Sequence, residues 1–194
     1  MREPKGAAEA ARSAGDRAAF DAFFSDHYRE LARFAYLLTG EHDAADDITA
    51  EALAEAWRHW SRVTATDLPL AYVRRIVANL AADRTATLVR ERRSWRLWGI
   101  GREDRTEPPD AAGVVDLREA LLRLPAGKRA CVVLRYYYGL SERETASTLG
   151  IAVGTVKSQS SRGLEELAAL LRGSRSAATV TRGRTRRSAK GATQ

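Results

Sequence analysis

The segment from Gly139 to Leu167 constrains the fold more than any other, because it contains the helix-capping and turn residues of a helix-turn-helix in order. Ser141 and Glu144 have the spacing of a capping box, in which each side chain accepts a hydrogen bond from the other residue's backbone amide. Gly150 lacks a Cβ and permits a sharp turn after one short helix. We therefore expect Gly139 to end the preceding helix, and two further helices to meet at Gly150.

The second helix of this unit, starting near Gly154, has two chemically different faces. Helical spacing places apolar and small residues on one face, namely Val156, Ser160, Leu164, Leu167 and Leu171. The candidates for DNA contact are Thr155, Ser158, Ser161 and Arg162 on the opposite face, flanked by Lys157 and Gln159. Short side chains let a helix approach bases in the major groove, cations neutralise phosphates, and the Gln159 amide can pair with adenine. An ordinary helical hairpin with a polar outer face is the alternative.

A longer helical stretch, about Asp116 to Tyr138, precedes this unit and is expected to pack behind it. Pro125 interrupts the stretch, so we predict two helices, the second starting near Ala126. The tyrosines at 136–138 could stack on bases, but packing in the core and at its rim is the favoured interpretation. Cys131 is the one cysteine; we interpret it as a small buried hydrophobe, and no internal disulfide can form.

Charged residues are segregated along the first half of the chain. Residues 26–55 hold eight acids and two arginines, whereas residues 58–96 hold nine arginines and three acids. Within the acidic part, Asp47, Glu51 and Glu55 fall in one stripe along a helix, beside residues that face a core. Two surfaces of opposite sign indicate two different partners, and two solvated helix faces are the alternative.

The basic part contains a helix from about Leu70 to Arg93, with Val73 and Val77 on its buried face. The loop before it, Ser61 to Leu68, is flanked by aromatic residues. Aromatic rings and arginines near one loop suit the capture of an unstacked base. The candidates for that role are Trp60, Arg62, Arg74, Arg75, Asn79 and Arg84. A core position is the alternative for the tryptophans, and it is favoured for Trp57.

The helical pattern divides the chain into two small all-α domains. Residues 20–93 form the first and residues 114–172 the second, and neither contains an alternating, strand-like run of useful length. Residues 94–113 contain several glycines and prolines and are expected to form a flexible linker. We predict a flexible N-terminus over residues 1–19, and a disordered basic tail over residues 173–194, which have too few apolar side chains to fold.

The composition argues against several classes of function. Seven of the 32 lysines and arginines lie in residues 172–194, where there is no acid, so the tail accounts for the net charge of +7. The histidines have no metal-ligand spacing with one another or with Cys131, so we expect no metal and no cofactor. The sequence contains no arrangement of nucleophile and base residues that would indicate an enzyme. The sequence has no apolar run of about 18 residues, so no membrane span is predicted. The N-terminus has no signal-peptide pattern, which makes the cytoplasm the expected compartment.

Four segments together resemble the extracytoplasmic-function (ECF) sigma factors of the sigma-70 family. They are ADDITAEAL at 45–53, AYVRRIVANLAADR at 71–84, residues 124–146, and GIAVGTVKS at 150–158. The first two are similar to sigma region 2 and the last two to sigma region 4. The tyrosine-rich stretch and residues 157–159 resemble an actinobacterial branch. The chain departs from the family's usual residues at Ala50, Tyr72, Ala152 and Gln159.

The resemblance implies a protein that binds core RNA polymerase and directs promoter recognition, DNA melting and transcription initiation. The acidic stripe of Asp47, Glu51 and Glu55 would dock on the polymerase. The candidates around the loop 61–68 would engage the melted −10 element, and those on the helix after Gly154 would read the −35 element. A one-component regulator, with the first block as a sensor and no need for polymerase, is the alternative. Whether an anti-sigma factor binds the chain stays open.

Overall fold

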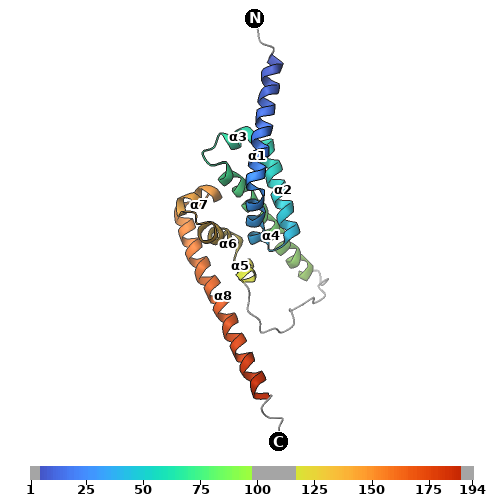
Figure 1. Ribbon diagram of the computed structural model, residues 1–194. Helices are drawn as coiled ribbons and strands as arrows, with labels where there is room; N and C mark the ends of the chain where they lie inside the picture. Colours follow the sequence, from blue (N-terminus) through green and yellow to red (C-terminus); the bar gives the residue numbers. More distant parts are fainter. Residues whose placement is uncertain (1–4, 98–116, 189–194) are drawn as a thin grey trace.

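The computed structural model describes residues 5–97 and 117–188, and the regular structure in these ranges is helical, which confirms the all-α class (Figure 1). The first block contains α1 (Lys5–Thr39), α2 (His42–Arg58), α3 (Trp60–Thr64) and α4 (Pro69–Leu97). The second contains α5 (Leu117–Arg123), α6 (Ala126–Val132), a short π-helix η1 (Val133–Tyr137), α7 (Glu142–Leu149) and α8 (Val153–Ser188). The outer ends of α1 and α8 project from the packed centre in opposite directions (Figure 1).

The local signals of the helix-turn-helix are confirmed. The Glu144 amide donates to Ser141 Oγ at 3.2 Å, and the Ser141 amide donates to Glu144 Oε2 at 2.7 Å, which completes the capping box. Gly150 ends α7 with a φ of 66°, a left-handed conformation that costs glycine little. Pro125 separates α5 from α6 as predicted. The helix-turn-helix is therefore α7 and α8, with α6 behind it.

Several helices are longer than the sequence pattern indicated. α1 begins at Lys5 rather than near Phe20, and α8 continues to Ser188, well past the predicted end of the second domain at 172. α4 continues to Leu97, so the predicted linker starts later than 94, and its remainder from 98 lies outside the described residues. The extension of α1 over residues 5–19 contains seven alanines, and the extension of α8 over residues 173–188 contains five arginines; both residue types favour helix without an apolar face. The expected flexible N-terminus and disordered tail are thus helical over residues 5–19 and 173–188.

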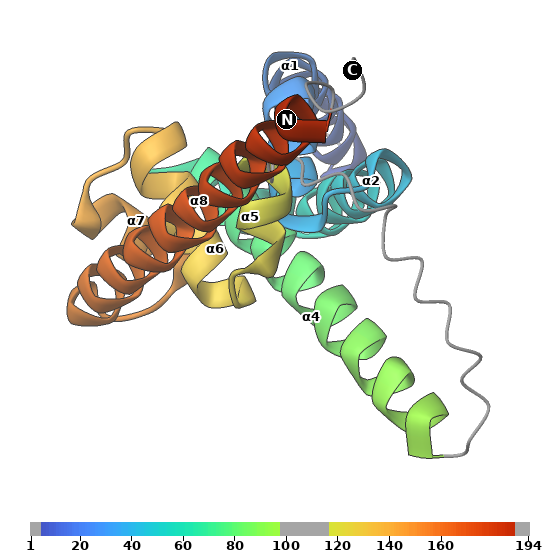
Figure 2. The ribbon, with the colours of Figure 1, turned by 90° about the horizontal axis from the view of Figure 1, so that it is seen from below.

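The two blocks share one apolar core instead of packing separately. Buried side chains of α1, α2 and α4 form a continuous cluster with buried side chains of α5, α6 and η1. α5 contacts α1, and both α6 and α7 contact α4. Figure 2 shows α5 and α6 beside the bundle of α1, α2 and α4, beyond which the end of α4 extends alone. The structure therefore shows the two helical blocks docked on each other.

Replacing Ala152 with serine is expected to raise the melting temperature by about 2–4 °C. The Ala152 carbonyl accepts from the amides of Thr155 (2.9 Å) and Val156 (3.1 Å), which makes this residue the N-cap of α8. Alanine has no side-chain oxygen for a first-turn amide, and serine would add about 1 kcal/mol. Thermal denaturation followed by circular dichroism checks the shift. Ala169→Ser, at an exposed position inside α8, is the control and should not stabilise; an unshifted Ala152→Ser variant would contradict this helix start.

Candidate nucleic-acid and protein interfaces

The acidic stripe lies on the outer face of α2. Asp47 and Glu51 are exposed and Glu55 is half-buried. On the opposite face Ile48 and Ala52 are buried, because α2 packs on α1 and α4 through these small apolar side chains. α2 and α7 lie on opposite sides of the molecule (Figures 1 and 2). The predicted alignment of the three carboxylates is confirmed, and the stripe is open to a partner.

The residues predicted for −10 contact differ in their exposure to solvent. Arg62, Arg75, Asn79 and Arg84 are exposed. Trp60 differs from the prediction because it is 5% exposed and its ring packs against Phe20 and Phe23, with centroids 5.2 and 5.4 Å away. Trp57, which we expected in the core, is 39% exposed. The chain turns at His59 between α2 and α3, and this turn directs Trp60 toward α1.

Arg74 lies inside a cluster of charged and aromatic residues. Its guanidinium forms an ion pair with Glu30, and its side chain is 11% exposed. The ring of Tyr138 lies over it, with the guanidinium carbon 4.9 Å from the ring centroid. The Tyr138 hydroxyl donates to the Glu30 carbonyl at 3.1 Å, and burial is the main cause that raises the pKa of Tyr138. In this structure the cluster, rather than solvent, surrounds the Arg74 charge.

The outer face of α8 is polar and open, as predicted. Lys157, Ser158, Ser161 and Arg162 are exposed, and Thr155 is half-buried. Both serine hydroxyls form hydrogen bonds within α8. Ser158 Oγ donates to the Thr155 carbonyl at 3.0 Å, and Ser161 Oγ donates to Glu165 Oε1 at 3.1 Å. Such hydroxyls still have lone pairs to offer to a base edge. Four of the six predicted −35 residues therefore present their side chains to solvent.

Gln159 differs from the prediction. Its side chain is half-buried against α6, where its Oε1 atom accepts a long contact of 3.8 Å from Cys131 Sγ. The same oxygen lies 2.7 Å from where a Cβ would stand on Gly127, so a side chain there would displace the amide end of Gln159. Helical spacing places Gln159 at the edge of the polar face, and the neighbouring helix turns its side chain inward.

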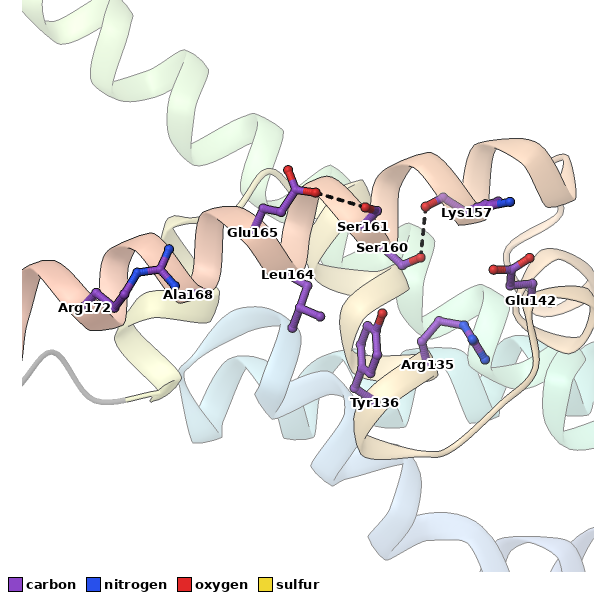
Figure 3. Close-up of a pocket in the computed structure, with 10 residues that line it drawn as sticks. All are labelled: Arg135, Tyr136, Glu142, Lys157, Ser160, Ser161, Leu164, Glu165, Ala168 and Arg172. Atoms are coloured by element: carbon purple, nitrogen blue, oxygen red, sulfur yellow. Dashed lines mark hydrogen bonds between the residues drawn. The ribbon is translucent and has the colours of Figure 1, made fainter.

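A groove of about 470 Å³ runs along one side of α8 (Figure 3). Figure 3 shows Arg135 and Tyr136 below the helix, on the side of Ser160 and Leu164. Residues that line the groove include Arg135, Tyr136, Glu142, Lys157, Ser161, Leu164, Glu165 and Arg172. Sequence reasoning missed Arg135, Arg172 and the exposure of Leu164 (41%), which we had placed on the buried face. Helical spacing could have placed Arg172 here, because residues 157, 161, 164, 168 and 172 lie on one face of a helix.

Tyr136 and Tyr137 are also more exposed than predicted, at 54% and 51%. Tyr138 alone is packed as expected, with its ring edge-on to Phe34 at 5.8 Å. Cys131 is fully buried, as predicted. The described ranges contain no group of three or more histidine, cysteine, aspartate or glutamate residues that could hold a metal ion. No helix in these ranges combines the length and apolarity needed to cross a bilayer.

Comparisons with known proteins match both blocks. Residues 23–93 match the family model of sigma-70 region 2, and residues 115–167 match that of sigma-70 region 4. The ECF RNA polymerase sigma factor SigM of Mycobacterium tuberculosis is 36% identical over 162 residues, which cover 84% of this chain and 82% of that protein. The sigma-E factor of Streptomyces coelicolor is 30% identical over 79% of this chain and 86% of its own length.

Two solved structures have similar folds. The sigma factor RpoE of Bartonella quintana, in complex with the anti-sigma factor NepR, aligns with a TM-score of 0.62 and 27% identity, covering 79% of this chain and 97% of that one. CnrH, in complex with the cytosolic domain of CnrY, aligns with a TM-score of 0.58 and 24% identity, covering 84% of this chain and 94% of that one. Both alignments extend over most of the chain, so they include helices from each block.

Proposed function

This chain belongs to the ECF family of RNA polymerase sigma factors, non-catalytic proteins of transcription initiation, and we propose from that premise how its surfaces divide the work. The stripe of Asp47, Glu51 and Glu55, of which the first two are exposed, binds core RNA polymerase. The single observation that carries this assignment is that α2 turns these carboxylates outward while its other face is buried. Carboxylates in a row attract arginines and lysines of a partner and repel acidic ones.

The first block captures the melted −10 element. Arg75, Asn79 and Arg84 are exposed along α4, and Arg62 is exposed on the preceding α3. Arginines neutralise phosphates of a single strand, and an exposed aromatic ring can stack on an unpaired base. Because Trp60 is buried, Trp57, which is 39% exposed, replaces it as a tryptophan that can stack on an unpaired base. Binding the unpaired state draws the equilibrium toward melted DNA without covalent chemistry.

The second block reads the −35 element through the exposed face of α8. Lys157 and Arg162 neutralise phosphates, while Ser158 and Ser161 approach base edges. Gln159 supports the helix from behind instead of reading a base, because its side chain lies on α6. We further propose that the chain acts in the cytoplasm, and that an anti-sigma factor binds it, as NepR binds the RpoE of Bartonella quintana.

Reconstitution with core polymerase tests this function. Core enzyme supplemented with the purified chain should give run-off transcripts from members of a random promoter library, and neither component alone should do so. The chain should also co-purify with core polymerase. A chain that ignored the polymerase, yet bound specific duplex sites unaided, would instead be a one-component regulator.

Lys157→Ala is expected to weaken promoter binding by the holoenzyme about equally for all sequences. The exposed Lys157 ammonium can neutralise one phosphate, so its loss should reduce the slope of log K against log salt by about one. Filter binding at several salt concentrations measures the slope. Lys128→Ala is the matched control, because the Lys128 ammonium pairs with Glu166 at 2.6 Å. Equal slopes for Lys157→Ala and the parent protein would remove Lys157 from the interface.

A further inference from the structure

We propose that the C-terminal extension of α8, residues 173–188, is a second DNA-binding surface that holds phosphates of the duplex flanking the −35 element. The helix assigned to that element continues without a break into this extension. The inference rests on the proposed function for the position of the −35 element. The attraction of the extension to duplex phosphates does not depend on that assignment and can be measured separately.

Positive charge is unbalanced at this end of the chain. The last acids of the sequence are Glu165 and Glu166, so residues 167–194 contain none. Seven of the 32 lysines and arginines lie in residues 172–194, which leaves 25 in the rest of the chain against 25 acids. The rest of the chain is therefore neutral, and a partner of high negative charge density is attracted to the extension. Residues 173–188 contain five arginines: Arg175, Arg182, Arg184, Arg186 and Arg187.

Helical spacing places three of these five arginine positions in line with the DNA-reading part of α8. Steps of three and four residues lead from position 157 through 161, 165 and 168 to 172. The same steps continue through 175, 179 and 182 to 186. The arginine row is defined as positions 172, 175, 182 and 186. Position 187 lies about 100° around the helix from 186, and position 184 lies on the opposite side from the row.

The groove beside α8 separates the two basic regions of this face. Lys157 and Arg172 are exposed at its two ends, and Arg135 joins them from η1 (Figure 3). Two acids, Glu142 and Glu165, also line the groove, so its charges nearly cancel. The unbalanced positive charge of α8 therefore begins at Arg172, at the start of the extension.

The length of α8 carries the arginine row past the bases that its first turns can reach. At 1.5 Å per residue, Arg172 lies about 15 Å along the helix from Arg162, and position 186 lies roughly 36 Å from it. The major groove is about 12 Å wide. A helix that crosses the groove with its first turns has thus left it by Arg172. The residues that follow meet phosphates rather than base edges.

The extension has no apolar face for packing on a protein core or a membrane. Its aliphatic residues are Ala177, Ala178 and Val180, and most of the others are arginine, serine or threonine. Helices that lie in a membrane surface need large apolar side chains on one face, and the centres of protein interfaces are depleted in charge. Phosphates require only cations and small hydroxyl donors. The end of α8 also projects away from the packed centre, where a duplex has room to approach (Figure 1).

Two pairs of substitutions separate the arginine row from the total charge of the extension. Arg182→Gln with Arg186→Gln removes two charges from the row, and Arg184→Gln with Arg187→Gln removes two charges that lie off it. Both pairs lower the net charge by two. Glutamine and arginine favour helix about equally, so a difference between the pairs reports position on the helix.

Filter binding of the holoenzyme to a promoter fragment, at several salt concentrations, measures the phosphate contacts. The fragment carries about two helical turns of duplex, or 20 base pairs, on each side of the −35 element. The row pair should lower the slope of log K against log salt by about two and weaken binding up to about 30-fold at 0.15 M salt. The off-row pair should lower the slope by less than half as much. Neither pair should change the preferred −35 sequence, because phosphates carry no sequence information.

Each alternative outcome assigns the extension differently. An unchanged slope for the row pair would remove the extension from DNA, and equal reductions for both pairs would remove the defined face; either result overturns the proposal. If the row pair instead weakens binding to core polymerase without DNA, the extension contacts an acidic protein surface and the proposal also fails.

The free chain distinguishes failure of this proposal from failure of the proposed function. If the chain does not bind core polymerase at all, the two pairs are compared on the free chain with a random-sequence duplex. A lower salt slope for the row pair than for the off-row pair would keep the extension as a phosphate-binding surface while the sigma-factor assignments fail. Equal slopes there would overturn both.

Discussion

Arg129→Met is expected to lower the free energy of unfolding by about 3–5 kcal/mol, because the side chain serves four backbone carbonyls at once. Its Nε atom donates to Leu121 at 2.9 Å, Nη2 donates to Leu122 at 2.8 Å and to Leu124 at 2.9 Å, and Nη1 donates to Leu38. Arg129 is 5% exposed, and burial lowers its pKa. Methionine fills much of the volume but donates to none of these carbonyls, of which Leu121 keeps a bond of 3.1 Å from the Leu124 amide. Each unsatisfied buried group costs about 1–3 kcal/mol.

Urea and thermal denaturation of the full chain measure this loss, and the melting temperature should fall by roughly 10 °C. Lys128→Met, one residue earlier on α6, is the control. Its ammonium pairs with Glu166 at a partly exposed site, so the loss should stay within about 1 kcal/mol. Arg129→Lys keeps the charge but has fewer donors, and it should fall between the two. A loss for Arg129→Met no larger than that for the control would show that the carbonyls find other partners.

Reversing the acidic stripe, with Asp47→Lys and Glu51→Lys together, is expected to weaken binding to core polymerase about 100- to 1,000-fold. Each reversal removes an attraction to a basic partner surface and adds a repulsion. Both carboxylates are exposed and lie on the face of α2 that does not pack on the core. The melting temperature of the variant should therefore stay close to that of the parent protein. Titration of fluorescently labelled chain with core polymerase gives the two dissociation constants.

Asp26→Lys with Asp83→Lys is the matched control for the stripe. Both residues are exposed, they lie on α1 and α4, and the pair changes the net charge by the same amount. The control should bind core polymerase within a few-fold of the parent protein, because long-range charge is screened at physiological salt. Equal losses in the two variants would mean that net charge, rather than the stripe, governs binding. Full affinity of the stripe variant would move the polymerase interface off α2.

The parts of this protein predicted correctly from sequence depend on interactions between near neighbours. The Ser141–Glu144 capping box, the break at Pro125 and the left-handed Gly150 each involve backbone groups within about four residues. The acidic stripe follows in the same way, because helical spacing alone aligns carboxylates four residues apart. Local chemistry of this kind is nearly independent of what packs against the helix.

The residues that differ from prediction are those at the edges of helix faces. Spacing places Trp60, Gln159 and Leu164 on a helix, but not against a particular neighbour. Trp60 is buried because α1 brings Phe20 and Phe23 to it, and Gln159 because α6 approaches at Gly127. Leu164 is left half in solvent beside the groove of Tyr136. At such positions, the element opposite decides between core and surface.

The sequence alone determined the two helical blocks, their turns and caps, and the family. These features follow from short spacings and local backbone preferences. Only the tertiary structure decided that the blocks dock on one another. The contacts responsible join residues far apart in the chain: Arg129 with Leu38, Arg118 with Gly40, and Tyr138 with Glu30. Each uses a backbone carbonyl as acceptor, and every residue has one, so no pattern of side chains could reveal the partner.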